Sequence, residues 1–341
     1  MKAQELWEEF CNKMKIDVNT SYEAWAFCGG GPVGDELADL VIARRKFGTA
    51  SAYDEYVIEN VVDEIPKAGD YSVILRDNGD AVCVIRDYEV YIRPFGDVTP
   101  FHAYSEGEGD RSLAYWKRVH TEFFQPALEA GGIPLTEESL VVCEKFSVEY
   151  VPGEESTKED ELLFVEPSMN YADEITAYRQ EMLDTGSSFD GCFSLKRTPN
   201  PQDFIEHCMT WSNPRRPAGE HGAWGNVILC IRKSDGRMVG CFQAHNVLSE
   251  CMKNYTGHVG YSVRPSERRK GYATRILAKS LDFLSSFGFT EISVSCLPDN
   301  EGSRKTILAN GGEYMETVYL AEDAVHLERY RIKLKSTDNP C

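Results

Sequence analysis

The sequence predicts a chain of two domains, an α+β domain followed by an α/β domain. Short β-rich runs separated by turn residues fill much of the first half, whereas strand-like and helix-like segments alternate in the second. Between them, the segment PGEESTKEDE combines proline, glycine and charge, which is typical of a linker. We therefore place the first domain at 1–151, an acidic linker at 152–161 and the second domain at 162–335.

The first domain begins with a helical stretch and the glycine run 29–31, after which a second helix is expected with Asp35 as its cap. The glycines lack the Walker lysine and the Rossmann spacing, so a flexible turn is the preferred interpretation. Turn signals such as Asn78-Gly79 then divide strand-like runs. Helices followed by short strands predict a small β-barrel with helices at its mouth. The expected strands are 71–75, 81–85 and 89–92.

The second domain is expected to form a sheet with helices on both faces. A hairpin is predicted around the turn 234–236, and apolar residues at three- and four-residue spacing between 276 and 287 predict a helix that ends near Gly288. The expected strands are 162–165, 226–232, 238–245, 255–263 and 291–296, and a further helix is expected at 171–183.

The segment from Val263 to Thr274 (VRPSERRKGYAT) joins a strand to a helix through a basic turn. The first turn of a helix offers unpaired backbone N–H groups and the positive end of the helix dipole, which together suit a phosphate. Gly271 and Ala273 keep side chains away from that position, and Arg268, Arg269 and Lys270 add positive charge. An ordinary basic helix start is the alternative, and the pattern favours a pyrophosphate site.

RRKGYA resembles the R/Q-x-x-G-x-G/A signature of the GNAT acetyltransferases, with Arg268, Gly271 and Ala273 at its defining positions. The later strand EISVSC, an N-x-x-S helix start at Asn300 and Ser303, and an NGG exit are also similar to that family. The resemblance implies a mixed α/β GNAT sheet and acetyl-CoA as the acetyl donor, but it does not identify the acceptor amine. The implied cofactor-binding residues are Val263, Arg268, Arg269, Lys270, Gly271, Tyr272, Ala273, Thr274, Asn300 and Ser303.

The catalytic acid and base are less evident. Many GNAT relatives have a tyrosine seven residues after the helix-start asparagine, but Ile307 stands there in this chain, which leaves solvent, Asn300 or Ser303 to protonate the thiolate. His258 lies where relatives place a glutamate base, and a packed strand histidine is the alternative. Tyr255 and Glu220 are weaker base candidates. The remaining histidines show no metal-ligand spacing, so we expect no metal.

The first domain resembles the ASCH domains, which share the PUA-like β-barrel fold, through RRKFGTASA, GDYSVIL and the stretch RPFGDVTPFHAYSEGEGD. The resemblance implies binding or processing of RNA or a modified nucleoside, because some ASCH members hydrolyse N4-acetylcytidine or cleave RNA. Lys46 and Thr49 match the K-x-x-T of the amidohydrolase members. Glu106 matches their glutamate, and Glu108 is a near alternative. A structural ion pair between Lys46 and Glu106, without catalysis, is the opposing interpretation.

Composition limits the function classes further. Residues 1–150 hold 14 Lys and Arg against 28 Asp and Glu, which argues against nucleic-acid binding through bulk charge. Eleven unpatterned cysteines and the lack of a signal or long apolar run favour a cytoplasmic protein with reduced thiols. The sequence therefore predicts an N-acetyltransferase for a small-molecule amine, with an ASCH module that binds or processes a nucleoside or RNA. A binding protein that senses acetyl-CoA, with a non-catalytic ASCH pocket, is the alternative.

Overall fold

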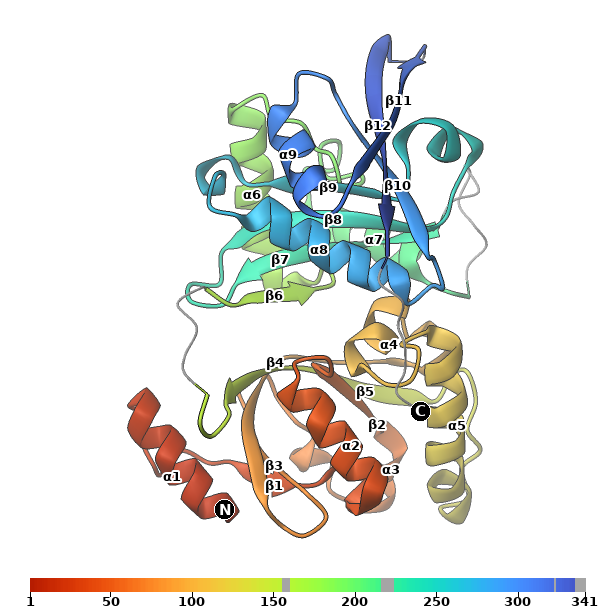
Figure 1. Cartoon of the computed structure of the whole chain (residues 1–341). Coiled ribbons are helices and arrows are strands. Elements are labelled where there is room, and N and C mark those ends of the chain that lie inside the picture. Colours follow the sequence, from red (N-terminus) through yellow and green to blue (C-terminus); the bar gives the residue numbers. More distant parts are fainter. Residues whose placement is uncertain (155–159, 216–223, 322, 335–341) are drawn as a thin grey trace. The chain divides into compact units, whose positions relative to one another are not determined.

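The computed structural model describes residues 1–154, 160–215, 224–321 and 323–334. The chain divides into two compact units, Met1–Thr157 and Lys158–Cys341 (Figure 1). The division falls inside the segment 152–161 that the sequence marks as a linker, and the bounds of that linker remain a prediction. Each unit is described by itself.

The first unit is a curled, open five-stranded sheet with helices around it, so the α+β class is confirmed. The strand order is β1-β3-β4-β5-β2, in which β1 runs parallel to β3 and the other pairs are antiparallel. Because β1 and β2 lie at opposite edges and do not pair, the described sheet is a half-barrel. Its elements are α1 (Ala3–Met14), β1 (Glu23–Trp25), α2 (Gly31–Ile42), β2 (Gly48–Ala52), α3 (Tyr53–Ile58), β3 (Tyr71–Leu75), β4 (Ala81–Pro94), α4 (Pro100–Glu106), α5 (Leu113–Ala130) and β5 (Leu140–Tyr150).

The helix α2 begins earlier than the sequence suggested. It begins at Gly31 with Pro32 in its first turn, where proline's fixed φ and missing N–H are favourable. Asp35 therefore lies inside the helix, and the prediction that it caps the helix is wrong. Its carboxylate instead accepts the backbone N–H of Asp77 at 2.9 Å, which ties α2 to the turn after β3.

The strand β4 corrects a second prediction. The runs 81–85 and 89–92 are parts of one continuous strand, Ala81–Pro94, which pairs with β5. The pairing register shifts between Asp87 and Glu89, which is a β-bulge. A bulge bends a strand and changes the direction of its side chains, and this one places Asp87 beside a pocket described below.

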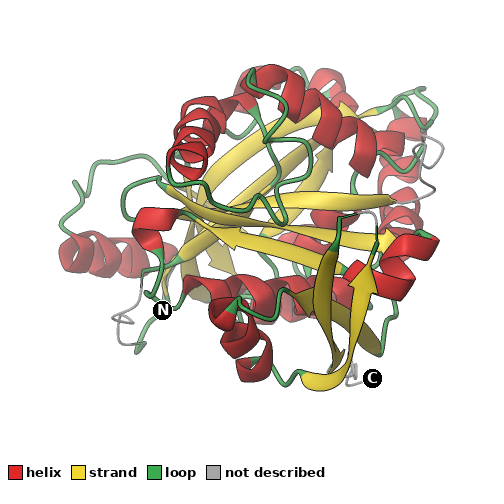
Figure 2. Ribbon diagram, turned by 90° about the horizontal axis from the view of Figure 1, so that it is seen from above, coloured by secondary structure: helices red, strands yellow, loops and turns green. Residues whose placement is uncertain are grey.

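The second unit contains two sheets, β6-β7-β8-β9 and β10-β12-β11, in agreement with the mixed α/β class. Helices lie on both sides of the first of these sheets (Figures 1 and 2). Two glycines make room for them, because a Cβ on Gly240 would meet Ile276 of α8 at 2.6 Å, and one on Gly225 would meet Trp211 of α7. The elements are β6 (Leu162–Val165), α6 (Ala172–Asp184), α7 (Pro201–Ser212), β7 (Trp224–Arg232), β8 (Met238–Val247), β9 (Val259–Val263), α8 (Tyr272–Ser285), β10 (Glu291–Cys296), α9 (Glu301–Ala309), β11 (Glu313–Leu320) and β12 (Val325–Lys333).

The strands β9 and β10 belong to different sheets and approach each other at one end. An isolated bridge joins Gly257 to Val294, and the backbone N–H of His258 donates to Ser293 at 2.8 Å. The strand β9 begins at Val259, later than expected, because a π-helical turn over Met252–Thr256 precedes it and Gly257 ends that turn with φ +87°. Beyond the bridge no further β9–β10 pairing exists among the described residues, so the inner edge of β9 is open.

Candidate functional sites

The turn before α8 presents a run of unpaired backbone N–H groups. Arg269 and Gly271 have φ values of +64° and +85°, which turn successive amides toward one side. Within the described parts of the chain, the N–H groups of Arg269, Lys270 and Gly271 have no acceptor. Those of the first helical turn have none inside the helix. A Cβ on Gly271 would meet no atom within 4 Å, so this position opens onto free space that a phosphate could fill.

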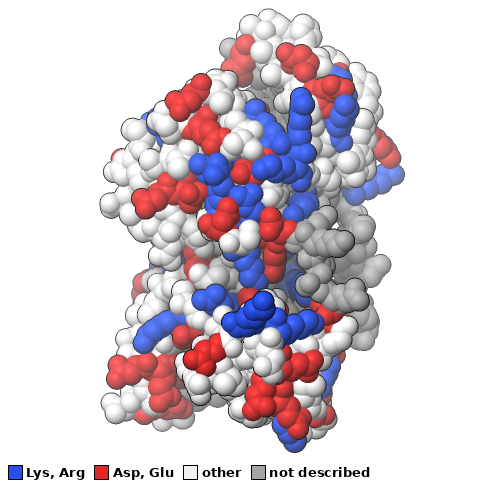
Figure 3. All heavy atoms as spheres, turned by 90° about the vertical axis from the view of Figure 1, so that its left-hand side faces the viewer, with Lys and Arg blue, Asp and Glu red and all other residues white. Residues whose placement is uncertain are grey.

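The basic side chains of this turn have different surroundings. Arg268 donates to the carbonyl of Val263 at 3.2 Å and to Ser187 Oγ at 2.9 Å, while Lys270 pairs with Glu267 at 2.8 Å. Arg269 is exposed. In Figure 3, Lys and Arg side chains gather on a face of the second unit.

Not every residue at this turn offers its side chain to a ligand. Tyr272 is buried, and its hydroxyl accepts a hydrogen bond from Arg232 at 3.2 Å, so only its backbone N–H can serve a ligand. Ala273 and Thr274 follow it in the first turn of α8.

The open edge of β9 carries a second set of polar groups. The N–H of Arg264 donates to Val239 of β8, so strand alternation directs the N–H of Val263 to the opposite, open side. On α9, the Asn300 side chain caps the helix by accepting the Ser303 N–H at 3.0 Å. Ser303 Oγ lies 3.0 Å from the hydroxyl of Tyr261, a half-buried β9 residue that the sequence analysis missed. Burial raises the pKa of Tyr261 to about 12, so its hydroxyl stays protonated at neutral pH.

His258 lies where β9 meets β10. Its Nδ1 accepts the backbone N–H of Ser293 at 3.1 Å, and its ring packs edge-on against Phe289. Burial lowers the pKa of His258, so the ring is neutral and its Nε2 carries the proton. The lone pair of Nδ1, which a base would use to accept a proton, already accepts the Ser293 N–H. His258 could act as a base only after that hydrogen bond breaks.

The other candidates in the second unit have simpler placements. Ile307 is fully buried, in keeping with the absence of a tyrosine acid at that position. Tyr255 lies in the π-helical turn and not on a strand, and Glu220 falls outside the described residues. In the same described part of the chain, no group of three or more His, Cys, Asp or Glu side chains could hold a metal ion.

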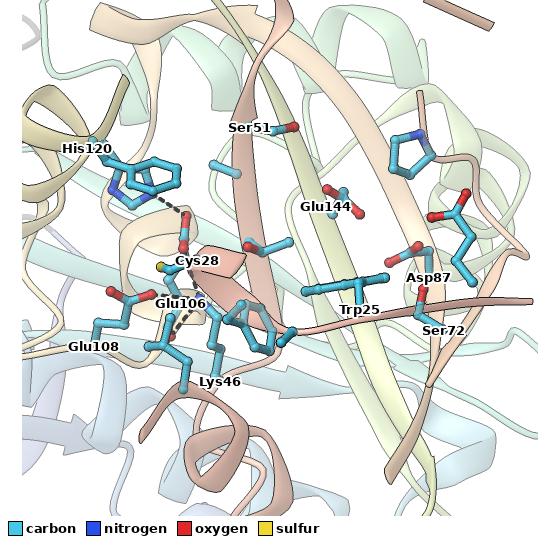
Figure 4. A pocket seen from close by; sticks show the side chains of 18 of the residues that line it. Trp25, Cys28, Lys46, Ser51, Ser72, Asp87, Glu106, Glu108, His120 and Glu144 are labelled. Atoms are coloured by element: carbon cyan, nitrogen blue, oxygen red, sulfur yellow. Dashed lines mark hydrogen bonds and ion pairs between the residues drawn. The ribbon is translucent and has the colours of Figure 1, made fainter. Parts of the chain in front are cut away.

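A pocket of about 960 Å³ opens in the first unit, and Lys46 lies at one end of it (Figure 4). Lys46 is 1% exposed, and its Nζ is 3.0 Å from Glu106 and 2.7 Å from Glu108. The other oxygen of Glu106 accepts hydrogen bonds from Trp116 Nε1 at 2.6 Å and faces His102 Nε2 at 3.2 Å. The sequence pair Lys46–Glu106 thus meets in space, and Glu108 joins it.

This network fixes the charges of its members. Burial alone would lower the pKa of Lys46, but Glu106 and Glu108 raise it above its ordinary value. Burial would raise the pKa of Glu106, yet Lys46 and His120 hold it well below its usual range. Lys46 is therefore cationic and Glu106 anionic at neutral pH, so Lys46 does not act as a base in this state.

Thr49 also lines the pocket but is not joined to Lys46. Among the described residues no hydrogen bond links its hydroxyl to Lys46 or Glu106. Thr49 faces Glu144 across the β2–β5 ladder, so these two side chains share a face of the sheet.

The opposite end of the pocket holds two carboxyl groups that the sequence analysis missed. Asp87 comes from β4 and Glu144 from β5, and Figure 4 places both near Trp25, away from Lys46. They are 57 residues apart in the sequence, and neither stands in a pattern that predicts a site. The sequence offered one signal, because the charged pair Arg86-Asp87 interrupts an otherwise apolar strand-like run.

Two family models match the chain, an ASCH domain over residues 23–150 and the acetyltransferase (GNAT) family over residues 198–311. No curated protein matches it significantly. No helix among the described residues is long and apolar enough to cross a membrane.

Solved structures resemble each half of the chain. An ASCH domain from Lactobacillus crispatus is 30% identical and covers 43% of this chain and 93% of its own, with a TM-score of 0.40. A protein from Enterococcus faecalis is 32% identical, covering 42% of this chain and 86% of its own, with a TM-score of 0.39. The Microcin C7 self immunity acetyltransferase, solved with acetyl-CoA and AMP, is 20% identical to this chain. The match covers 52% of this chain and 94% of that protein, with a TM-score of 0.40. The two family models identify the chain as an ASCH domain followed by a domain of the GNAT acetyltransferase family.

Proposed function

We propose that the second domain transfers an acetyl group from acetyl-CoA to the amine of a small acceptor. The main support for this proposal is the set of unpaired backbone N–H groups around Gly271. Their partial positive charges point toward one side of the turn, where a pyrophosphate would fit. Acetyl-CoA would supply the acetyl group as a reactive thioester. Arg268, Arg269, Lys270 and Gly271, with the first-turn N–H groups of Tyr272, Ala273 and Thr274, would hold its pyrophosphate. Val263, Asn300 and Ser303 would lie closer to the reacting atoms.

The open edge of β9 supplies groups for the chemical step. The N–H of Val263 would stabilise the developing negative charge on the thioester oxygen. The hydroxyl of Tyr261, held by Ser303, would give a proton to the leaving thiolate, since burial keeps that hydroxyl protonated. Asn300 would act on Ser303 by fixing the start of α9. We assign the base to solvent or to His258 after loss of its Ser293 contact.

The test compares two glycines at opposite ends of α8. Gly271 and Gly288 have φ values of +85° and +79°, and a Cβ on either would meet nothing within 4 Å. Glutamate at either position therefore imposes similar backbone strain, but only Gly271→Glu places a carboxylate in the proposed pyrophosphate site. We expect Gly271→Glu to weaken acetyl-CoA binding at least about 100-fold in calorimetry and Gly288→Glu to leave it unchanged. Equal binding by both variants would contradict the proposal.

Turnover is tested separately. Mass spectrometry of small-molecule amines and RNA nucleosides after incubation with acetyl-CoA should reveal an acetylated product that the Gly271→Glu variant does not form. Binding of acetyl-CoA without any acetylated product would favour the alternative role, an acetyl-CoA sensor with a ligand-binding ASCH pocket.

We propose as a second function that the ASCH pocket binds a modified nucleoside and hydrolyses its acetyl-amide. The buried Lys46–Glu106 pair at the pocket end favours this, because cationic Lys46 can polarise an amide carbonyl. The Glu106 carboxylate can accept the proton of the attacking nucleophile and pass that proton to the leaving amine. A water molecule would attack the carbonyl carbon directly, or Thr49 would attack first and form an acetyl ester that water then hydrolyses to acetate. Incubation with N4-acetylcytidine should release acetate, and Glu106→Gln should abolish that release. If Glu108→Gln has the larger effect, the glutamate assignment moves to Glu108.

A further inference from the structure

The end of the ASCH pocket opposite Lys46 contains two carboxyl groups, and no hydrogen-bond donor reaches them from the described residues. Asp87 is 5% exposed and Glu144 8% exposed, and both line the pocket (Figure 4). The Oδ1 atom of Asp87 is buried without a hydrogen bond, and no described residue donates to the carboxyl of Glu144. Buried acceptors are nearly always satisfied in folded proteins, so Asp87 Oδ1 calls for a donor from a bound ligand, and Glu144 lines the same pocket with its carboxyl group unpaired among the described residues.

The electrostatic state of the pair supports the same conclusion. Burial, then Asp70 and Glu23, raise the pKa of Asp87 to about 7. Burial, then Asp87 and Glu106, raise the pKa of Glu144 well above its ordinary value. Neighbouring carboxyl groups therefore disfavour the charge of both acids, and a cationic donor placed between Asp87 and Glu144 would relieve that repulsion.

The pocket lining defines the charge of a suitable ligand. Its ionisable side chains include seven carboxyl groups against one lysine, and that lysine is already paired with two of them. A phosphate group would be repelled throughout such a lining, whereas an amine, amidine or guanidine would be attracted. The carboxyl groups belong to Glu23, Asp70, Asp87, Glu106, Glu108, Glu122 and Glu144.

Trp25 defines the shape of the ligand. This half-buried residue of the edge strand β1 lies beside Asp87 and Glu144 in Figure 4. Its ring packs edge-on against Phe27, with centroids 4.7 Å apart, which fixes its orientation at the pocket wall. A flat aromatic wall next to paired acceptors suits a planar ring that carries N–H donors at its edge.

We propose that Asp87 and Glu144 bind the amino or amidine edge of a planar, phosphate-free ligand whose ring lies against Trp25. Each carboxylate accepts an N–H of that edge, in the paired arrangement that makes charged hydrogen bonds strong. The proposal rests on the binding role given to the ASCH pocket above and narrows it to a free base, a nucleoside or a similar cyclic amine, in preference to a nucleotide or RNA strand.

The test uses three probes of one shape on the full chain: benzamidine, benzamide and benzoate. Calorimetry at pH 8 should give measurable binding of benzamidine at millimolar concentration, weaker binding of benzamide and none of benzoate. Asp87→Asn and Glu144→Gln should each weaken benzamidine binding at least about 10-fold, because each removes a charged acceptor. Glu122→Gln is the matched control, since it removes the same charge from an exposed position on the pocket rim and should change binding less than about 2-fold.

Thermal unfolding of each variant separates lost binding from lost folding. Absence of benzamidine binding by the parent chain, equal binding of benzoate, or unchanged binding by folded Asp87→Asn and Glu144→Gln proteins would each overturn the proposal. None of these readouts requires acetyl transfer or amide hydrolysis, so a failure of either proposed reaction is distinguishable from a failure of this one.

Discussion

Replacing Asp87 by asparagine should stabilise the first unit, and the gain should depend on pH. Burial, Asp70 and Glu23 raise the pKa of Asp87 from 3.8 to about 7. Glu144 faces the same pocket, and Asp87 in turn contributes to the raised pKa of Glu144. Asparagine has nearly the same shape and never ionises, so the variant avoids the free energy needed to charge a buried carboxyl group.

The sign follows from proton linkage. Between pH 4 and 7 the unfolded chain releases the Asp87 proton while the folded chain retains it, so the parent loses stability as the pH rises. Above pH 7 the loss is complete. A shift of about three pKa units at about 1.4 kcal/mol each gives a gain of about 4 kcal/mol for Asp87→Asn at pH 8 and almost none at pH 4.

The assay is urea unfolding of the full chain, followed by hydrogen exchange and mass spectrometry of peptides from β3, β4 and β5. These peptides report the first unit separately, because the chain has two units and a single unfolding midpoint would mix them. A variant that is no more stable than the parent at pH 8, or equally stabilised at pH 4 and pH 8, would refute the reasoning.

Three further predictions concern other residues of the two units. Lys46→Met should destabilise the first unit by about 3 to 5 kcal/mol in urea unfolding, because it leaves Glu106 buried without its counter-charge. Tyr261→Phe should lower kcat of acetyl transfer about 10- to 100-fold with little change in KM, because the proton donor is lost and Ser303 alone remains. Gly191→Ala should lower the thermal midpoint, with a cost of about 2 kcal/mol or more, since its φ is +76° and its Cβ would lie 2.5 Å from a backbone oxygen.

Two of these predictions have a matched control variant. Arg44→Met breaks the exposed pair with Glu154 and should cost less than about 1 kcal/mol. Gly186→Ala carries a similar φ of +61° with open space around it, so it should cost about 1 kcal/mol. Equal effects in a variant and its control would remove the structural reason given for it. For Tyr261→Phe, an unchanged kcat would exclude Tyr261 as the acid.

Local sequence patterns predicted much of the fold. Alternation and turn residues predicted β6 and β10 with the bounds that the structure has, because strand pairing there follows the local sequence. Asn300 caps α9 as an N-x-x-S start suggests. The predicted bounds of α2, β4 and β9 were less accurate. The helix α2 begins at the Gly31-Pro32 pair, a bulge after Asp87 lies within β4, and a π-helical turn precedes β9. Hydrophobic periodicity does not encode these backbone features.

The sequence by itself determined the turn from Val263 to Thr274, because its unpaired amides, positive φ and charges all come from residues adjacent in the chain. Only the tertiary structure decided which distant groups meet. It brought Asp87 beside Glu144 and Tyr261 beside Ser303, and it buried Lys46 between two carboxylates. The physical reason is that burial, pairing and the resulting pKa shifts arise where separate strands and helices pack together, and such contacts leave no periodic pattern in one sequence.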